Sequence, residues 1–488
     1  MYHAIIFTGL HQVDRSYYRP LGAYRIRSEL ESLGYNVKVL EHFHHLTDEH
    51  IEQALDKYVG KETLWVGFST TFINTSTLLK DRTEFFTQQR QKHNVPFVVG
   101  GAKSIVEFLP FADAFITGYA DNAAVAITDY YAGKGPEPQW SNYKGAKLIN
   151  SNHQYDRKDL SNIGVIWKPE DHINPMQSLP MEIARGCIFN CAFCNFPLNN
   201  KKKFDYVRVK DDMYAEFMRN YEDFGVTNYW FMDDTYNDSM HKLELMHDVI
   251  TSLPFKINYD TYIKPELVSR WPDQVALLAE TGLRGASLGV ESLNREARQA
   301  VQKGADADKV LDVISALKSA NNRQIKIQCN FIVGLPHESI ESIWQTHETV
   351  INNDDIDWWN WYPLQIHSKD HYEYHSPIDR DPKKYGYEVA DTVKLIKSNF
   401  VGDNIWMGFW KNDKMNSMQA KNLSTKLRAM DEPLQKVAGW NCGSYASLGL
   451  DIDKHYEEHD GLIQKMPIED MKKAKDILVE DYIQSEIT

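Results

Sequence analysis

Residues 184–196, ARGCIFNCAFCNF, decide how the rest of the chain is interpreted. The stretch carries three of the five cysteines, Cys187, Cys191 and Cys194. A closed tetrahedral zinc site needs four ligands, and disulfides use cysteines in pairs. Three thiolates at this spacing can hold one face of a cuboidal iron–sulfur cluster and leave one iron without a protein ligand. The alternatives are a zinc knuckle that lacks a ligand and loop cysteines without a role.

The composition is that of a soluble globular protein. The chain has 488 residues, enough for two or three domains, with 42% hydrophobic and 25% charged residues. Its net charge of −14 argues against non-specific nucleic-acid binding, and the basic run at 201–203 is interpreted as a solvated loop. We see no membrane-spanning run, secretory signal or disulfide framework, and therefore expect a cytoplasmic protein.

Residues 1–135 alternate between short apolar runs and helical patterns. This alternation predicts a doubly wound, Rossmann-like α/β domain, whose parallel sheet is covered by helices on both faces. Ligands of such sheets bind beyond the carboxyl ends of the strands. The strands are expected at 3–9, 36–43, 63–70, 95–101 and 113–121, and the helices at 21–35 and 77–93.

The alternation resumes over 179–370, after a stretch at 136–178 that is rich in Pro, Gly and Asn and reads as a linker. Six β/α units predict a complete or partial (β/α) barrel, with its chemistry at the carboxyl ends of the strands. The three cysteines directly follow the first of these strands. Residues 371–488 are expected to be mostly helical, and irregular just beyond about 400. The barrel strands are expected at 181–185, 228–233, 256–263, 285–291, 324–334 and 358–366.

With Phe193 beside the last cysteine, the motif resembles the Cys-x3-Cys-x-aromatic-Cys signature of the radical S-adenosylmethionine (SAM) superfamily. The preceding Arg185 and Gly186 match the family's frequent Arg-Gly-Cys. The resemblance covers about 180–370. It implies a [4Fe–4S] cluster on the three cysteines, SAM chelated to the fourth iron, and reductive cleavage of SAM to a 5′-deoxyadenosyl radical.

The resemblance also implies SAM contacts at the strand ends. The alternative for Asp233 and Asp234 is a helix cap or first-turn carboxylate, a role that Asp234 or Asp238 could fill, and Glu291 could begin the next helix. In the fifth-strand motif NFIVGLPHES, Asn330 replaces the family's first Gly. Its acidic end is displaced to Glu338 or replaced by His337. The candidate SAM residues are Phe193, Asp233, Asp234, Glu291, Ile332, Gly334 and Glu338.

The N-terminal pattern resembles the cobalamin-binding domain of the cobalamin-dependent radical SAM subfamily. Small residues at its loops would allow close approach of a corrin. The last loop, GYADNA, departs from the usual Gly-Glu-Gly-Glu, and no Asp-x-His-x-x-Gly motif is present; His11 is the nearest candidate lower ligand, at the wrong spacing. The alternative is a domain that binds nothing or binds substrate. The candidate cobalamin residues are Pro20, Leu21, Gly22, Ser69, Thr70, Thr71, Gly100, Gly101 and Gly118.

Together these resemblances imply a radical SAM enzyme that methylates an unactivated carbon or phosphorus of a small molecule or peptide. An electron donor such as flavodoxin or ferredoxin would be its partner. The alternatives are a cyclase or rearrangement enzyme, a cobalamin-free radical SAM enzyme, and an iron–sulfur sensor.

Four further features were weighed. Cys442, in a Gly-rich loop, is a candidate hydrogen-atom donor or a plain loop thiol, and Cys329 is expected in the core. The strand at 358–366 should turn half of its aromatic residues inward, where they could form a substrate wall. A metal site on His367, His371 and His375 is a weak alternative to a solvated surface. The aromatic residues are Trp358, Trp359, Trp361 and Tyr362.

Overall fold

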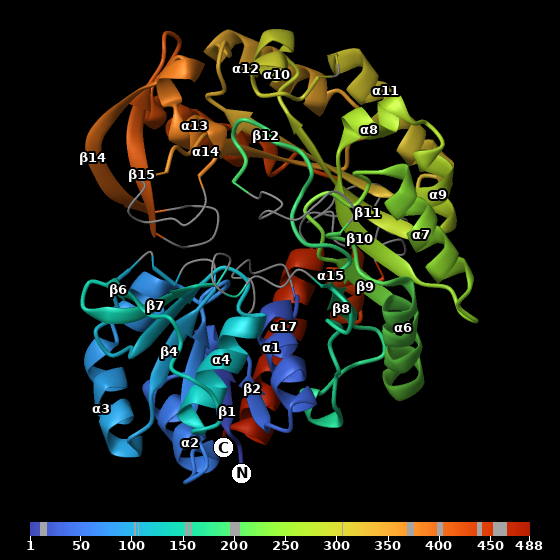
Figure 1. Ribbon diagram of the computed structural model, residues 1–488. Helices are drawn as coiled ribbons and strands as arrows, with labels where there is room; N and C mark the ends of the chain where they lie inside the picture. Colours follow the sequence, from blue (N-terminus) through green and yellow to red (C-terminus); the bar gives the residue numbers. More distant parts are fainter. Residues whose placement is uncertain are drawn as a thin grey trace.

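The fold is built on two mainly parallel sheets, the first formed within residues 4–150 and the second within residues 178–363 (Figure 1). The predicted α/β class, with a doubly wound domain followed by a barrel-type domain, is confirmed. The computed structural model describes residues 1–9, 17–101, 104–105, 107–151, 155, 159–195, 205–304, 306–367, 375–397, 404–436, 442–451 and 466–488.

The N-terminal sheet has seven strands in the order β2-β1-β3-β4-β5-β7-β6. Alternate residues of β1 enter two separate cores: Ala4 and Ile6 pack with helices α1 and α4, whereas Ile5 and Phe7 pack with α2 and α3. The apolar runs are therefore buried on both faces, as a doubly wound sheet requires. The strands are β1 Ala4–Phe7, β2 Val37–Leu40, β3 Trp65–Ser69, β4 Phe97–Gly100, β5 Ala114–Thr117, β6 Ser141–Tyr143 and β7 Ala146–Asn150; the helices are α1 Leu21–Ser32, α2 Asp48–Tyr58, α3 Thr83–His93 and α4 Asp121–Tyr131.

The expectation that 136–178 is only a linker is wrong for its first part. β6 and β7 extend the sheet, with β7 parallel to β5 and β6 antiparallel to β7. The hairpin turns through Lys144 and Gly145, whose φ angles of 52° and 93° are those of a tight two-residue turn. The Lys-Gly pair was the overlooked signal in a stretch otherwise rich in loop residues.

The second sheet has six parallel strands in the order β13-β12-β11-β10-β9-β8, and its two edge strands do not pair. It is therefore a partial barrel. Helices cover its outer face (Figure 1). The strands are β8 Ser178–Met181, β9 Asn228–Phe231, β10 Asn258–Ile263, β11 Leu283–Glu291, β12 Lys326–Val333 and β13 Trp358–Pro363; the helices are α6 Lys210–Phe224, α7 Met240–Thr251, α8 Pro265–Arg270, α9 Gln274–Glu280, α10 Arg295–Ala300, α11 Ala307–Ala320 and α12 Ile340–Ile351.

Helices predominate among the described residues of the C-terminal region, as expected, but the expectation of an irregular segment just beyond about 400 is wrong. β14 Glu388–Lys397 and β15 Asn404–Lys411 form an antiparallel hairpin. The run NIWMGFWK carries β-forming aromatic residues, and its partner strand supplies the pairing that makes it regular. The helices are α13 Pro377–Arg380, α14 Ser417–Asp431, α15 Cys442–Ser447 and α17 Met466–Glu486.

Helix α17 returns to the N-terminal domain and lies beside it (Figure 1). Tyr482 accepts a hydrogen bond from the backbone N–H of Glu41 at 2.9 Å, and Ile487 enters the core that β1 shares with α2 and α3. The end of the chain is therefore packed against its first domain. Among the described helices, none is long and apolar enough to cross a membrane.

Candidate active site

The cysteine loop leaves the carboxyl end of β8 and is fixed by backbone contacts on two sides. Ala192 donates to the carbonyl of Val301 at 3.2 Å and accepts from the N–H of Ile378 at 2.9 Å. Cys187 and Cys191 are buried and Cys194 is half-buried. None of the three forms a disulfide.

Two neighbouring side chains contact the cysteine sulfurs. Thr235 Oγ1 lies 3.3 Å from Cys187 Sγ, and Lys264 donates from Nζ to Cys191 Sγ at 3.6 Å. Lys264 also lies 4.9 Å from the centre of the Phe189 ring. Burial raises the pKa of the Cys187 thiol, with the Thr235 hydrogen bond opposing this rise. Cationic and hydroxyl donors thus surround sulfur ligands that must be negative when they hold metal.

The donor set fits a cluster better than a single ion. In the part of the chain that the structure describes, no three Cys, His, Asp or Glu side chains are grouped to hold one metal ion. A cuboidal cluster makes no such demand, because each cysteine binds a different iron. Three cysteines outside any disulfide, with the ammonium of Lys264 beside Cys191, suit the [4Fe–4S] interpretation.

The neighbouring aspartates Asp233 and Asp234 have different environments. Asp233 is buried, binds Lys242 Nζ at 2.9 Å and accepts from the N–H of Thr235 at 3.0 Å. Asp234 is exposed, but protein atoms around its carboxyl displace part of its hydration. This desolvation, together with the nearby charge of Asp233, raises the pKa of Asp234 to about 7. Asp233 therefore holds the strand end, and Asp234 is the carboxyl available to a ligand.

Glu291 ends β11 with an unusual backbone conformation. Its φ of 66° is uncommon for a residue with a side chain and marks a constrained position. Its carboxylate lies 3.5 Å from Lys303 Nζ, which also donates to the Gly289 carbonyl at 2.7 Å. Burial raises the pKa of Glu291, while Lys303 opposes this and Glu266 adds to it.

The motif at the end of β12 has a half-buried residue, Ile332, on the strand and a buried carboxylate, Glu338, behind the loop. Ile332 is half-buried on the strand, and Gly334 has a φ of 103°. A Cβ at Gly334 would come within 2.6 Å of the Trp410 ring, so this position requires glycine. Glu338 is buried and accepts from Ser292 Oγ at 2.6 Å; burial raises its pKa to about 8, against backbone hydrogen bonds from Gly334 and Leu335. Glu338 thus supports the loop from behind.

The inner face of the partial barrel carries aromatic side chains. Tyr259 points outward, where its hydroxyl lies 2.8 Å from Thr281 Oγ1 at the end of α9, so the neighbouring Asp260 and Tyr262 point inward. Tyr262 remains 39% exposed. On β13 the expected division is observed: Trp359 and Trp361 point outward and Trp358 and Tyr362 inward. The inner aromatic side chains are Trp230, Tyr262, Trp358 and Tyr362.

The candidate cobalamin loops lie together at the carboxyl edge of the N-terminal sheet. Ser69 pairs with Gly100 across β3 and β4, and the N–H of Thr70 donates to the Gly100 carbonyl at 2.7 Å. A Cβ at Gly101, whose φ is 112°, would come 3.0 Å from the N of Thr71. The two loops are thus in backbone contact, which only small residues allow.

The remaining loop residues flank this contact. Pro20 and Leu21 begin α1, Gly22 is exposed, and Gly118 follows β5 with a φ of 79°. The strand order reverses between β1 and β3, the place where ligands bind in doubly wound sheets. His11 lies outside the described residues.

The edge faces the barrel. Tyr18, which follows the β1 loop, packs on Trp230 of β9 with their ring centres 4.3 Å apart. The edge of small residues and the inner aromatic face are therefore neighbouring surfaces.

The two cysteines outside the cluster motif, Cys329 and Cys442, are both buried. Cys442 begins α15 rather than lying in an irregular loop, is buried, and lies 3.4 Å from the Arg284 carbonyl. Cys329 is fully buried, as expected, and burial raises its pKa well above the usual range. His367 contacts Asp379 at 3.4 Å, and His371 lies outside the described residues.

Four further side chains lie near the cysteine loop, and no sequence motif singled them out: Lys264, Thr235, Lys303 and Asp121. A lysine directly after the strand KINYDTYI was a detectable signal, because it falls at the carboxyl end where barrel chemistry lies. The other three are brought near the loop by tertiary packing.

Residues 181–350 match the sequence model of the radical SAM superfamily. The chain carries a radical SAM domain. The cysteine loop lies at the end of the first strand of this domain, and a radical SAM domain implies a [4Fe–4S] cluster and SAM as cofactors.

Two characterised relatives match much of the chain. Bacteriochlorophyllide d C-8(2)-methyltransferase of Chlorobaculum tepidum is 23% identical over 331 residues, which are 62% of this chain and 66% of that protein. Anaerobic magnesium-protoporphyrin IX monomethyl ester cyclase of Cereibacter sphaeroides is 23% identical over 350 residues, 65% of this chain and 54% of that protein. The match spans less than two thirds of either relative.

Solved radical SAM structures share the fold over nearly the whole chain. The methyltransferase TsrM of Kitasatospora setae superposes with a TM-score of 0.66 at 13% identity, covering 99% of this chain and 100% of TsrM. OxsB, a cobalamin-dependent SAM radical enzyme solved with aqua-cobalamin, gives 0.59 at 10% identity over 99% and 75%. The arrangement of an N-terminal doubly wound domain before a radical SAM domain is therefore shared.

Proposed function

We propose that this radical SAM enzyme is cobalamin-dependent and methylates an unactivated carbon, or a phosphorus, of a small molecule or peptide. The observation that carries the proposal is the N-terminal edge of small residues facing the barrel, in a fold shared along its length with TsrM and OxsB. The methyltransferase from Chlorobaculum tepidum supports the same chemistry.

The bound groups would supply a carbon-centred radical from SAM and a transferable methyl group from cobalamin. In this assignment Cys187, Cys191 and Cys194 hold three irons of the cluster. The exposed Asp234 would accept hydrogen bonds from the ammonium of SAM, and the half-buried Glu291 at the end of β11 would be a second SAM contact. The loops at 20–22, 69–71, 100–101 and 118 hold cobalamin.

The inner aromatic face would bind the substrate. Tyr262 of β10 and Tyr362 of β13 both belong to this face, and Tyr262 is 39% exposed. Aromatic surfaces bind flat or apolar groups by stacking and burial. A substrate with such a group would lie between the cluster end of the barrel and the edge of the N-terminal sheet.

Spectroscopy tests the cobalamin assignment. The protein, produced with hydroxocobalamin and purified without oxygen, should retain corrin absorbance in addition to the brown colour of the cluster. Gly101→Val would place side-chain atoms against the backbone at Thr70 and Thr71, and should abolish corrin retention while leaving iron content unchanged. A wild-type protein that holds iron and never corrin would refute cobalamin dependence.

Isotope labelling tests the reaction. With methyl-labelled SAM, a low-potential reductant or a reduced flavodoxin or ferredoxin, and candidate substrates, the enzyme should release 5′-deoxyadenosine and place label in the product. Changing the three cysteines to alanine should stop both. Release of 5′-deoxyadenosine that survives this change, or none at all, would favour an iron–sulfur sensor.

Ring formation is the second candidate, favoured by the similarity to the Cereibacter sphaeroides cyclase. The same labelling experiment separates the two reactions. A cyclase would release 5′-deoxyadenosine and form product that contains no labelled methyl group, whereas the proposed methyltransferase transfers the label.

A further inference from the structure

Arg185, two residues before the first cluster cysteine, is held between two carboxylates. On one side it contacts Glu182, with Nε to Oε1 at 2.6 Å and Nη2 to Oε2 at 3.0 Å. On the other side it contacts Asp121, with Nη1 to Oδ2 at 2.8 Å and Nη2 to Oδ1 at 3.0 Å. The arginine side chain is 2% exposed. Paired contacts on both sides fix the plane of the guanidinium as well as its position.

Glu182 belongs to the same segment as the cysteines, but Asp121 belongs to the N-terminal domain. It is the first residue of α4 and follows the loop at Gly118. Arg25 of α1 approaches the same carboxylate at 3.1 Å, and the Tyr119 ring lies 4.7 Å from the Arg185 guanidinium. Burial alone would raise the pKa of Asp121, but Arg185 and Arg25 hold it well below the usual range. Asp121 is therefore a buried anion matched to two cations.

We propose that Asp121 is a positioning residue that shapes the cluster-binding loop from the other domain. Only Gly186, with a φ of 77°, separates Arg185 from Cys187. Holding the Arg185 guanidinium in place therefore restrains the position of the first cysteine. The backbone N–H of Arg185 also donates a hydrogen bond to the Tyr206 carbonyl at 2.9 Å. This role depends on the cluster and not on cobalamin, and it gives the unusual GYADNA loop a function of its own.

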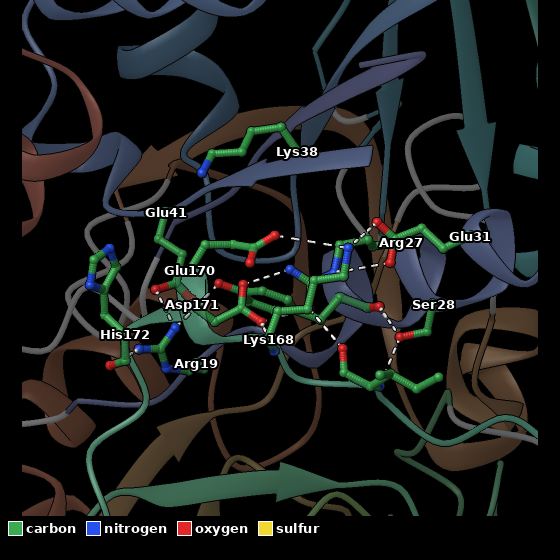
Figure 2. Close-up of polar contacts among 12 residues, drawn as sticks. Arg19, Arg27, Ser28, Glu31, Lys38, Glu41, Lys168, Glu170, Asp171 and His172 are labelled. Carbon is green, nitrogen blue, oxygen red and sulfur yellow. Dashed lines mark hydrogen bonds and ion pairs between the residues drawn. The ribbon is translucent and has the colours of Figure 1, made fainter. Parts of the chain in front are cut away.

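The chain offers a matched control. Arg27 of α1 makes a similar paired contact with Asp171, at 2.5 Å and 2.6 Å, and both side chains are buried (Figure 2). This pair joins α1 to the segment at 169–171. Within the described part of the chain, the hydrogen bonds and ion pairs of Arg27 and Asp171 reach Ile166, Lys168 and Glu31 and no residue of the cysteine loop. Asp171→Asn therefore removes a buried charge that pairs with α1 without touching that loop.

The test measures the cluster directly. Asp121→Asn, Asp171→Asn and wild type are reconstituted with iron and sulfide, and the rate at which a ferrous chelator removes iron is followed at equal protein concentration. We expect about tenfold faster iron release for Asp121→Asn, equivalent to about 1.4 kcal/mol, and a wild-type rate for Asp171→Asn. The electron paramagnetic resonance signal of the reduced cluster with SAM should broaden or shift only in Asp121→Asn.

Conservative changes separate positioning from folding. Asp121→Glu keeps the charge and should restore most of the iron retention, whereas Arg185→Lys keeps a charge but loses the paired contacts and should release iron like Asp121→Asn. Combining Asp121→Asn with Arg185→Lys should add little, because both break one interaction. Wild-type iron retention in Asp121→Asn, or equally fast release from Asp171→Asn, would overturn the proposal. Neither readout depends on cobalamin or methyl transfer, so the two proposals fail separately.

Discussion

Single residues around the cysteines decide how readily the cluster takes up an electron. Lys264 is buried and points its ammonium at Cys191 Sγ. A positive charge and a hydrogen bond at a cluster sulfur favour the reduced state, because reduction adds negative charge there. The position of Lys264 directly after a barrel strand was a detectable signal, but only the folded structure shows that its ammonium reaches a cysteine sulfur.

Replacing Lys264 with Met should therefore make the cluster harder to reduce. The expected change is a fall in midpoint potential of roughly 50 mV, the one-electron equivalent of about 1 kcal/mol. Redox titration followed by electron paramagnetic resonance measures it in the absence of substrate. Lys264→Arg keeps the charge and should stay near wild type. A potential unchanged in Lys264→Met would show that the ammonium does not influence the cluster.

Asp260 gives a prediction for pH dependence. Its side chain is almost completely buried, and burial raises its pKa from 3.8 to about 7, against hydrogen bonds from the backbone of Gly443 and Cys442 and the charge of Arg284. Between these two values the folded protein holds a proton that the unfolded chain has lost. The free energy of unfolding therefore falls as the pH rises from 4 to 7, by at most about 4 kcal/mol.

Asp260→Asn should remove this fall. The melting temperature of the variant relative to wild type should rise between pH 5 and pH 8, when both are measured without cofactors. Asp248→Asn, which changes a carboxylate that is 65% exposed, should show no such trend. A constant difference between Asp260→Asn and wild type across this range would contradict the pKa shift.

At the scale of elements, one buried carboxylate joins α14 to the outer face of the barrel edge. Asp431 accepts from Trp359 Nε1 and Trp361 Nε1, each at 2.7 Å, and lies 2.6 Å from His347 Nε2 of α12. Two tryptophans of β13 and one histidine of α12 thus contact a single carboxylate of α14. An asparagine at this position would offer only one acceptor oxygen, and its NH2 group would face side chains that are themselves hydrogen-bond donors.

Asp431→Asn should destabilise the protein by about 2–3 kcal/mol, because buried donors lose their acceptor. Thermal unfolding without cofactors measures the loss, and hydrogen exchange should locate it in β13 and α14. Asp413→Asn, at a carboxylate that is 71% exposed, is the matched control and should change little. Similar losses for the two variants would refute the role of Asp431.

The sequence predicted elements well where apolar runs repeat and poorly where pairing partners are distant. Most strands of the two sheets follow from local apolar runs, but β6 and β7 do not, and β8 spans Ser178–Met181 rather than the expected 181–185. The hairpin of β14 and β15 did not, because the run at 404–411 has too few polar alternations to reveal a strand without its partner. The Arg185 contact with Asp121 spans 64 positions, and no local pattern encodes it. The SAM contacts at Asp233 and Glu338, which the family resemblance implies, stay predictions; the structure shows that both side chains are buried.

For the whole molecule, the last helix connects the end of the chain to its beginning. Glu486 of α17 lies 2.8 Å from His172 Nε2 and accepts from the hydroxyl of Tyr58 at 3.2 Å, and Lys38 of β2 forms an ion pair with it. Burial would raise the pKa of Glu486, but Lys38 and His172 hold it below its ordinary value. The carboxylate thus contributes stability above its unfolded pKa, and this contribution is lost as the pH falls through its lower folded value.

Glu486→Gln should therefore loosen α17 from the N-terminal domain at neutral pH. We expect a loss of about 1–3 kcal/mol and faster cleavage of α17 in limited proteolysis, since the helix is held at its far end by this group and by Tyr482. The difference from wild type should shrink in acid, where wild type itself loses the charge. Glu480→Gln, at an exposed position of the same helix, should leave proteolysis unchanged. Unchanged proteolysis in Glu486→Gln would show that the rest of the helix interface suffices to hold α17.

Helix α17 packs on the domain that we propose binds cobalamin. Loosening it in Glu486→Gln should therefore also reduce corrin retention while iron stays bound.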